Sequence, residues 1–316
     1  MKELFILGLA LLGTALSSEN TPKCLPSATT VSGTHAPSSF CSAGGGNWEF
    51  QWYNNNRTNS FARDSTLFIR PSLLSDQFGR AFLTNGRLNI EGGAPADRCT
   101  NPQCARIRTV DSFSFRYGRV EVRAKMPAGD WLWPAIWLMP AFNAYGSWPS
   151  SGEIDLVESR GNRHMQLHGV PIGVQEAGST LHYGPYPELN GWDRAHWVRL
   201  NDAGWNSNFH RYQLEWTPDF LRFSIDDVQL GLIQPNEGGF WEFGGFNHFA
   251  GLENPWRFGS KMAPFDQKFY FIMNVAVGGT NGFFPDGVFN PLPKPWTNQS
   301  PTATNSIIVN FYNLIK

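Results

Sequence analysis

Acidic side chains stand close together in the segment 152–161, GEIDLVESRG, whose other residues include several apolar ones. Charged carboxylates are almost never buried without a partner or a function. Glu153 and Glu158 are five residues apart, which separates them by about 140° around a helix. Ile154 and Val157 are β-branched and favour a strand. The segment therefore predicts a strand that carries acidic side chains.

The spacing of the acids requires an irregular strand. Side chains alternate between the two faces of a strand, so Glu153 and Asp155 would share one face and Glu158 would lie on the other. A single β-bulge between Asp155 and Glu158 adds one residue and returns Glu158 to the first face. Ile154 and Leu156 then pack into the core. We expect a bulged strand with all three carboxylates on one face.

Hydrolysis of a glycosidic bond is the chemistry that uses such a row. One carboxylate acts as nucleophile and another protonates the leaving oxygen. Asp155 would hydrogen-bond Glu153 and bias the pair, so that the nucleophile stays ionised while Glu158 stays protonated. The spacing alone also fits a solvated strand edge or a calcium site, since hard cations gather carboxylates. We predict Glu153, Asp155 and Glu158 as catalytic residues, with no cofactor and no metal, and with structural calcium as the open alternative.

Tryptophans surround the acids in the sequence. Trp148 precedes Glu153 by five residues, across a Pro-Ser-Ser-Gly turn, and there it could floor a sugar subsite. Trp131 and Trp133 alternate as core residues do, and we also assign Trp137 to the core. Trp133 is kept as a substrate-binding candidate as well.

The composition limits the partners of the chain. Its 316 residues include 25 basic and 26 acidic side chains, a formal charge of −1, so no strong field attracts nucleic acid or an anionic membrane. Aromatic residues make up 15% of the chain, with 13 Trp. Flat apolar rings stack on sugars, so the composition favours a carbohydrate partner.

The frame that must position these residues is built from strands. From residue 47 onward, short β-type runs alternate with turn residues, helical stripes are scarce, and 32 Gly and 22 Pro punctuate the chain. Val120, Val122 and Ala124 alternate with charged residues, and Asp226-Asp227 fits a hairpin turn. We predict an all-β fold, an antiparallel β-sandwich or jelly roll, formed by residues 47–316.

The first residues predict secretion. Lys2 precedes an apolar run that ends near Leu16, and Ala15-Leu16-Ser17 has the small-x-small form of a cleavage site, so residues 1–17 are expected to be a signal peptide. Residues 18–46 are rich in Ser, Thr, Gly and Pro and are expected to form an extended arm. The mature protein is expected to be extracellular.

Four cysteines fit an oxidising compartment. Cys24, Cys41, Cys99 and Cys104 allow three pairings, and nearness in sequence favours Cys24–Cys41 and Cys99–Cys104. No short C-x-x-C pair is present that would indicate zinc.

Several segments together resemble the family 16 glycoside hydrolases, in the order of that family. They are YGRVEVRAKMPAGDWLWPAIWLMP, WPSSGEIDLVESRGN, STLHYG, YQLEWTPDFLRFSID and NVAVGGTNGFFPDG. The resemblance is strongest to the animal laminarinase-like branch, which includes β-1,3-glucan recognition proteins of invertebrate immunity. It implies a jelly roll with a concave glucan-binding cleft and retaining hydrolysis. Glu153 would be the nucleophile, Asp155 its helper and Glu158 the acid/base.

The resemblance also suggests residues that bind substrate. His182 in STLHYG matches a family histidine near the catalytic row. Arg106 matches a family arginine that suits sugar hydroxyls, although a structural ion pair is an equal alternative. Asn274 lies on a strand that the family places in the cleft, with a backbone hydrogen bond as its plainer role. His168 and His210 are expected to be structural or exposed.

We therefore expect a secreted, monomeric, retaining endo-β-1,3-glucanase. The alternative is a non-catalytic β-1,3-glucan recognition protein of innate immunity, which has no need of Glu153 and Glu158. A third hypothesis is a defective isoform, because CSAGGGNW, CTNPQCARIRT and TNSIIVNFYNLIK are shorter than or differ from the family pattern, and outer strands would be missing there.

Overall fold

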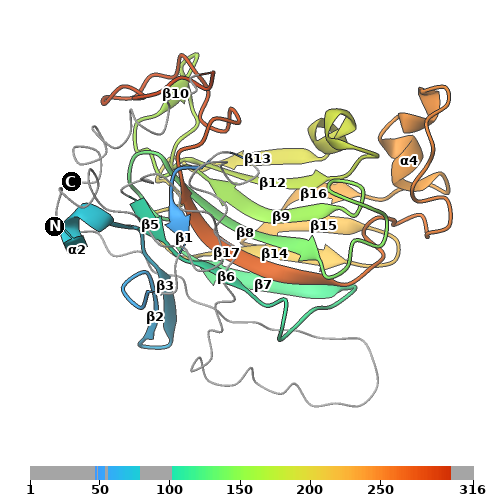
Figure 1. Ribbon diagram of the computed structural model, residues 1–316, viewed down its shortest axis with the longest axis horizontal. Helices are drawn as coiled ribbons and strands as arrows, with labels where there is room; N and C mark the ends of the chain where they lie inside the picture. Colours follow the sequence, from blue (N-terminus) through green and yellow to red (C-terminus); the bar gives the residue numbers. More distant parts are fainter. Residues whose placement is uncertain (1–46, 48, 54–55, 79–101, 300–316) are drawn as a thin grey trace.

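The computed structural model describes residues 47, 49–53, 56–78 and 102–299 (Figure 1). In these residues two antiparallel sheets lie face to face, which confirms the predicted all-β sandwich. The predicted signal peptide at 1–17 and the arm at 18–46 lie outside the described residues and stay predictions. No helix in the described ranges is long and apolar enough to cross a membrane.

The first sheet has six strands in the spatial order β13–β12–β9–β8–β17–β6, and every neighbouring pair is antiparallel. Figure 1 shows its long strands curving across the molecule. The acidic segment is β9, an interior strand that is hydrogen-bonded on both sides. The strands are β6 (Arg106–Arg108), β8 (Leu132–Pro140), β9 (Glu153–Ser159), β12 (Glu176–His182), β13 (His196–Leu200) and β17 (Phe269–Val277).

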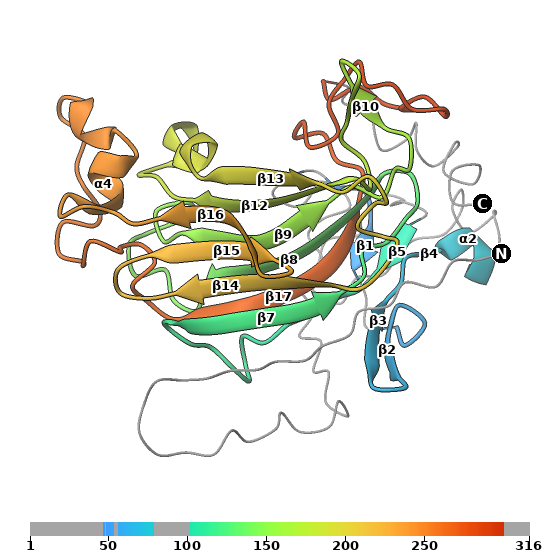
Figure 2. The ribbon, with the colours of Figure 1, turned by 180° about the vertical axis from the view of Figure 1, so that it is seen from behind.

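The second sheet has four strands in the order β16–β15–β14–β7 and faces the viewer in Figure 2. On β7, Val120, Val122 and Ala124 are buried while Glu121 and Arg123 are at least partly exposed, which confirms the predicted alternation. The strands are β7 (Gly118–Ala124), β14 (His210–Trp216), β15 (Leu221–Ile225) and β16 (Val228–Ile233).

Smaller elements surround the two sheets. The short strand β5 pairs in parallel with β1 and antiparallel with β4, and two hairpins join β2 to β3 and β10 to β11. Their bounds are β1 (Trp52–Tyr53), β2 (Ser60–Arg63), β3 (Thr66–Ile69), β4 (Ser72–Leu73), β5 (Pro102–Cys104), β10 (Gln166–Leu167) and β11 (Val170–Pro171). The helices are short: α2 (Leu74–Phe78), α4 (Gly239–Phe243), η1 (Pro187–Leu189), η2 (Gly191–Arg194) and η3 (Phe246–His248).

The core lies between the two sheets and is rich in aromatic rings. Trp216 of β14 meets Phe269 of β17 edge-on, with ring centroids 5.5 Å apart. The ring centroids of Trp197 on β13 and Phe223 on β15 are 5.7 Å apart. The Trp197 ring fits because β16 has Gly231 beneath it, where a Cβ would overlap the indole. Such rings bury large apolar areas, so the core holds the six-stranded sheet rigidly in place.

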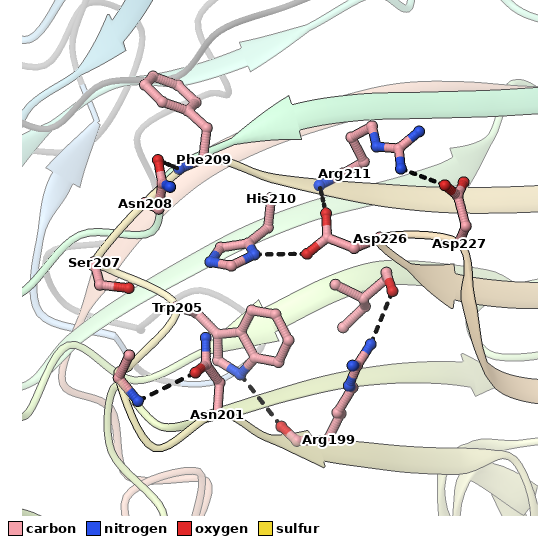
Figure 3. A network of polar contacts seen from close by, with 12 residues as sticks. Arg199, Asn201, Trp205, Ser207, Asn208, Phe209, His210, Arg211, Asp226 and Asp227 are labelled. Atoms are coloured by element: carbon pink, nitrogen blue, oxygen red, sulfur yellow. Dashed lines mark hydrogen bonds and ion pairs between the residues drawn. The ribbon is translucent and has the colours of Figure 1, made fainter.

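The predicted Asp-Asp hairpin is confirmed between β15 and β16. Asp226 and Asp227 have φ angles of 51° and 65°, which suit the tight turns that match strand twist. The Asp226 carboxylate accepts hydrogen bonds from His210 Nδ1 at 2.7 Å and from the Arg211 amide at 2.8 Å (Figure 3). His210 is therefore structural, as predicted.

The predicted Cys99–Cys104 disulfide is not formed. Cys104 on β5 is a free thiol, fully buried, and burial raises its pKa to about 12. The thiol occupies a small core position and is masked from exchange with other thiols. Cys24, Cys41 and Cys99 lie outside the described residues.

Candidate active site

Strand β9 contains the predicted bulge. On the neighbouring strand β8, Ala135 pairs with Glu158 and Trp137 pairs with Asp155, so one residue of β8 lies opposite two residues of β9. The register against β12 shifts in the same interval. Glu153 and Glu158 are partly exposed, whereas Asp155 is only 2% exposed. The extra residue returns Glu158 to the face of Asp155, as the spacing requires.

A hydroxyl group completes the hydrogen bonding of the bulge. Ser179 of β12 donates from Oγ to the carbonyl oxygen of Leu156 at 2.7 Å, and both residues are buried. Ile154, Leu156 and Val157 are at most 1% exposed and belong to the core. The core side of β9 is therefore apolar, and its acids lie on the outer face of the sheet.

Trp148 contacts the first acid of the row. Its indole Nε1 donates to Glu153 Oε2 at 2.6 Å, and its ring lies 5.7 Å from the ring of His182. The side chain is 38% exposed, so one part of the ring stays open to a ligand. The predicted position beside the acids is confirmed, while sugar binding stays a prediction.

Trp133 contacts Glu158, the last acid of the row. Its Nε1 donates to Glu158 Oε1 at 2.8 Å, and its ring stacks on Phe283 with centroids 3.9 Å apart. Trp133 is 6% exposed, which leaves little of it for a sugar. Trp133 is buried with the core, as its alternation predicts, and its indole nitrogen also fixes Glu158, while sugar binding stays a prediction.

The middle acid contacts a histidine. His182 Nε2 lies 3.1 Å from Asp155 Oδ2, and Asn190 Nδ2 lies 2.8 Å from His182 Nδ1. His182 pairs with Glu153 across β12 and β9, so it shares the face of the acids. The predicted placement of His182 near the row is confirmed.

Comparison with known proteins identifies the family of this chain. The family model described as glycosyl hydrolases family 16 matches residues 84–240. A β-1,3-glucan-binding protein of Penaeus monodon is 48% identical over 291 residues, which cover 86% of this chain and 76% of that protein. The chain belongs to glycosyl hydrolase family 16.

Two further proteins of known type are similar to this family 16 chain. A glucan endo-1,3-beta-glucosidase of Cryptopygus antarcticus is 33% identical over 249 residues, covering 78% of this chain and 76% of that protein. The X-ray structure of the laminarinase from Rhodothermus marinus matches with a TM-score of 0.53 and 29% identity, over 79% of this chain and 83% of that one. The chain spans about half the length of several other curated relatives.

Burial changes the protonation of the family 16 acid row. It raises the pKa of Asp155 well above its ordinary value, and the charges of Glu153 and Glu158 raise it further. Burial also raises the pKa of Glu158, although His182 and the Trp133 donor lower it. A carboxyl group with a raised pKa keeps its proton to higher pH, as a general acid requires.

His182 is subject to opposing influences. Burial lowers its pKa, but the contact with Asp155 and the charges of Glu153 and Glu158 raise it to about 9. The ring is therefore drawn toward the charged form by the carboxylates alone.

A second polar group lies beside the row on the same face. The register aligns Arg106, Asn274, Ala135 and Glu158 across four strands, and direct partners share a face. Asn274 Oδ1 accepts from Trp137 Nε1 at 2.7 Å. The structure thus brings the predicted substrate-binding residues Arg106 and Asn274 to the face of the acids.

The contacts of this group are with aromatic rings and with other side chains. Arg106 lies over the Trp137 ring at 4.7 Å and the Tyr53 ring at 5.9 Å. Asn274 Nδ2 donates to the Tyr53 hydroxyl at 3.0 Å. The roles of Arg106 and Asn274 in substrate binding stay predictions.

The core assignment of the tryptophans is correct for one and wrong for another. Trp131 is fully buried and contacts Trp296 edge-on at 5.1 Å. Trp137 is only partly buried and pairs directly with Asp155, so it lies on the outer face. The side chains of β8 are buried or partly buried along both faces, so the sequence of the strand does not show that Trp137 lies on the outer one.

The acid row could in principle attract a cation. The ligand atoms of Glu153, Asp155 and His182 lie within 4.8 Å of one another. Glu153 already accepts from Trp148, and His182 contacts Asn190. These protein partners and the raised pKa of Asp155 suit proton transfer, and the expectation that no metal binds here stays a prediction.

The sequence did not reveal three residues of the site. Phe283 and Arg160 support Trp133: Arg160 lies 4.2 Å over the Phe283 ring, and its Nε donates to the Phe283 carbonyl at 2.7 Å. Asn190 is the third. Phe283 lies in a segment that carries the family resemblance, but nothing in the sequence around Asn190 marks it as part of the site.

Proposed function

We propose that this family 16 chain is a secreted, monomeric endo-β-1,3-glucanase that hydrolyses its substrate with retention. The observation that supports it most is the complete row of Glu153, Asp155 and Glu158 on one face, with an indole N–H on each glutamate. The names of the relatives from Cryptopygus antarcticus and Rhodothermus marinus support the substrate class.

The roles of the acids follow from two-carboxylate chemistry. Glu153 attacks the anomeric carbon while Glu158 protonates the departing oxygen, and Glu158 then removes a proton from the water that releases the sugar. Trp133 occupies Oε1 of Glu158, which leaves Oε2 to carry the transferred proton. Asp155 and His182 sit beside Glu153 and tune the charge of the row.

Hydrolysis of laminarin tests the proposal. The purified protein is expected to release reducing sugar, and Glu153→Gln and Glu158→Gln are each expected to lose at least about a thousandfold in kcat, as for the removal of a catalytic group. Glu253→Gln is the control, because its side chain is 88% exposed. Wild-type activity equal to that of Glu153→Gln would end the proposal.

Azide rescue separates the roles of the two glutamates. With an activated aryl β-glucoside, Glu153→Ala and azide are expected to give the α-glycosyl azide, because azide replaces the missing nucleophile. Glu158→Ala and azide are expected to give the β-glycosyl azide, through attack on the glycosyl-enzyme. The same anomer from both variants would contradict the assigned roles.

A glucan recognition protein is the second candidate function. It is favoured by the name of the Penaeus monodon relative, β-1,3-glucan-binding protein. It predicts retention of the protein on insoluble β-1,3-glucan without release of sugar, and unchanged retention of Glu158→Gln. Release of soluble oligosaccharides by the wild-type protein, but not by Glu158→Gln, would favour the enzyme over the recognition protein.

Secretion and oligomeric state are tested with the same preparation. The protein is expected in the medium of producing cells, with its N-terminus after residue 17, and as a monomer in light scattering. Retention inside the cells with Met1 still present would contradict the secretory part of the proposal.

A further inference from the structure

The loop between β12 and β13 reaches into the acid row through one side chain. Asn190 lies between η1 and η2, and its side chain contacts two residues at the end of β12. Its Oδ1 accepts from the backbone amide of Tyr183 at 3.3 Å, and its Nδ2 lies 2.8 Å from His182 Nδ1. Gly191 donates to the Tyr183 carbonyl at 2.7 Å, which holds this part of the loop against β12.

The orientation of the Asn190 amide follows from the hydrogen bonds it can make. Tyr183 is fully buried, and its backbone N–H is only a donor, so it needs an acceptor. The amide oxygen of Asn190 supplies that acceptor. Rotation of the amide would set two donors against each other and leave a buried N–H unpaired. The amide nitrogen therefore faces His182.

The amide nitrogen is also only a donor, so His182 Nδ1 must accept. We propose that Asn190 is a positioning residue that holds His182 in the neutral form with its single proton on Nε2. The protonated Nε2 then lies 3.1 Å from Asp155 Oδ2. An imidazolium would place a proton on Nδ1, against the amide N–H.

The charged groups around His182 influence whether its ring is protonated. Glu153, Asp155 and Glu158 of β9 favour a positive ring, and His196 of β13 is the further titratable group that interacts with it. Although burial lowers the pKa of His182, the carboxylates raise it to about 9 and by themselves would charge the ring at pH 7, and the Asn190 N–H that faces Nδ1 works against them. With the imidazole uncharged, a proton bound in the cluster stays on a carboxyl group, where Glu158 can use it to protonate the leaving oxygen.

Asn190→Asp gives a precise test. The aspartate keeps an oxygen for the Tyr183 amide but replaces the donor at His182 Nδ1 with an acceptor, which favours the imidazolium. Protein labelled with ¹⁵N in its histidine rings is observed at pH 7, and His182→Gln identifies the resonance. The wild type is expected to show an unprotonated Nδ1 and a protonated Nε2. Asn190→Asp is expected to show two protonated nitrogens.

Asn208→Asp is the matched control, because it adds the same charge at an exposed position where the side chain only accepts from the Phe209 amide. It is expected to leave the His182 resonance unchanged. A wild-type His182 with both nitrogens protonated at pH 7 would overturn the proposal. The wild-type spectrum decides this without any variant of Asn190 having to fold.

Laminarin hydrolysis adds a second readout, which rests on the proposed function. An imidazolium beside Glu158 lowers the pKa of that acid, so the alkaline limb of kcat/KM is expected to move to lower pH in Asn190→Asp, with at least a tenfold loss at pH 8. An unchanged pH profile in an active Asn190→Asp would contradict the role of Asn190. Absence of hydrolysis by the wild type would refute the proposed function and leave the ring-nitrogen result to decide the inference.

Discussion

At the scale of residues, the two outer acids have the same kind of partner in different surroundings. Trp148 donates to Glu153 from a partly exposed position, while Trp133 donates to Glu158 from a buried one. An indole N–H is a donor that never accepts and never titrates, so it favours the charged form of a carboxyl group. Burial has the opposite effect on Glu158: it raises the pKa of that acid and outweighs the hydrogen bond from Trp133, which lowers it.

Trp133→Phe is expected to raise the pKa of Glu158 further. The hydrogen bond from Trp133 lowers that pKa by stabilising the carboxylate, so its loss lets the acid keep its proton to higher pH. The alkaline limb of kcat/KM for laminarin should move to higher pH, and kcat should fall about tenfold because Glu158 is held less firmly. A limb that moves to lower pH would contradict this account of Glu158.

At the scale of elements, the bulge in β9 depends on the strand beside it. The bulge leaves the carbonyl group of Leu156 outside the regular ladder, and Ser179 of β12 donates to it. A buried carbonyl group without a donor is unfavourable. The position of Glu158 is therefore linked to a hydroxyl group that takes no part in chemistry.

Ser179→Ala is expected to lower the free energy of unfolding by about 1–3 kcal/mol, the cost of a buried polar group without a partner. Ser207→Ala removes a bond of the same 2.7 Å length to the Gly204 carbonyl, but at an exposed position where water can replace it. That control should change stability by less than about 0.5 kcal/mol. Urea unfolding of both variants gives the comparison, and equal losses would contradict the role of Ser179.

The loop that follows β17 supports Glu158 from the other side. Phe283 stacks on Trp133, and Arg160 fixes Phe283 through its ring and its carbonyl oxygen. This chain of contacts ends at Glu158. The loop thus helps to position Glu158 through Trp133.

Phe283→Leu should lower kcat for laminarin about three- to tenfold, because looser packing of Trp133 misplaces Glu158. The KM should change little if Phe283 does not bind the glucan. Phe289→Leu is the matched control, since it changes the same residue type at a 61% exposed position. A loss confined to KM would assign Phe283 to substrate binding instead.

At the scale of the whole molecule, the site lowers the stability that the core provides. Asp155 is buried among other carboxylates, and its pKa is raised well above the ordinary value. The folded protein therefore binds a proton more tightly than the unfolded chain does. The free energy of unfolding then falls as pH rises from the ordinary carboxyl range through the folded pKa. Each pKa unit of this shift corresponds to about 1.4 kcal/mol.

Asp155→Asn is expected to remove this pH dependence. The variant should gain stability over the wild type at pH 7–8, and the difference should shrink toward pH 3, below the ordinary Asp pKa, where Asp155 is largely protonated in both states. Thermal unfolding between pH 3 and 8 measures the difference in Tm. A difference in Tm that does not vary with pH would contradict the raised pKa of Asp155. Hydrolysis of laminarin should be impaired in the same variant, because the residue that lowers the stability belongs to the proposed catalytic row, and active sites often trade stability for activity.

Much of this architecture could be predicted from local sequence patterns. The alternation of Val120 and Val122 fixes the faces of β7, and the unequal spacing of the acids in β9 predicts its bulge. Both patterns depend only on residues that are neighbours in the chain. The same is true of the Asp226-Asp227 turn.

The errors arise where distant segments meet. Which face of β8 is the outer one depends on the packing of the second sheet, and the partner of Trp133 comes from another strand. Asn190 approaches His182 only because the loop folds back on β12. Cys104 is a free thiol although another cysteine precedes it by five residues. No periodicity of the chain encodes such pairings, because they result from tertiary packing.

The extra residue in β9 makes the number of positions between the two glutamates as important as the glutamates themselves. Loss of one codon there would leave both acids in the gene and turn one of them toward the interior of the protein. A homologue could lose its cutting activity in this way and still hold the polysaccharide. Surveys that sort such proteins into hydrolases and binding proteins should therefore compare the number of residues between the two glutamates as well as the residue types.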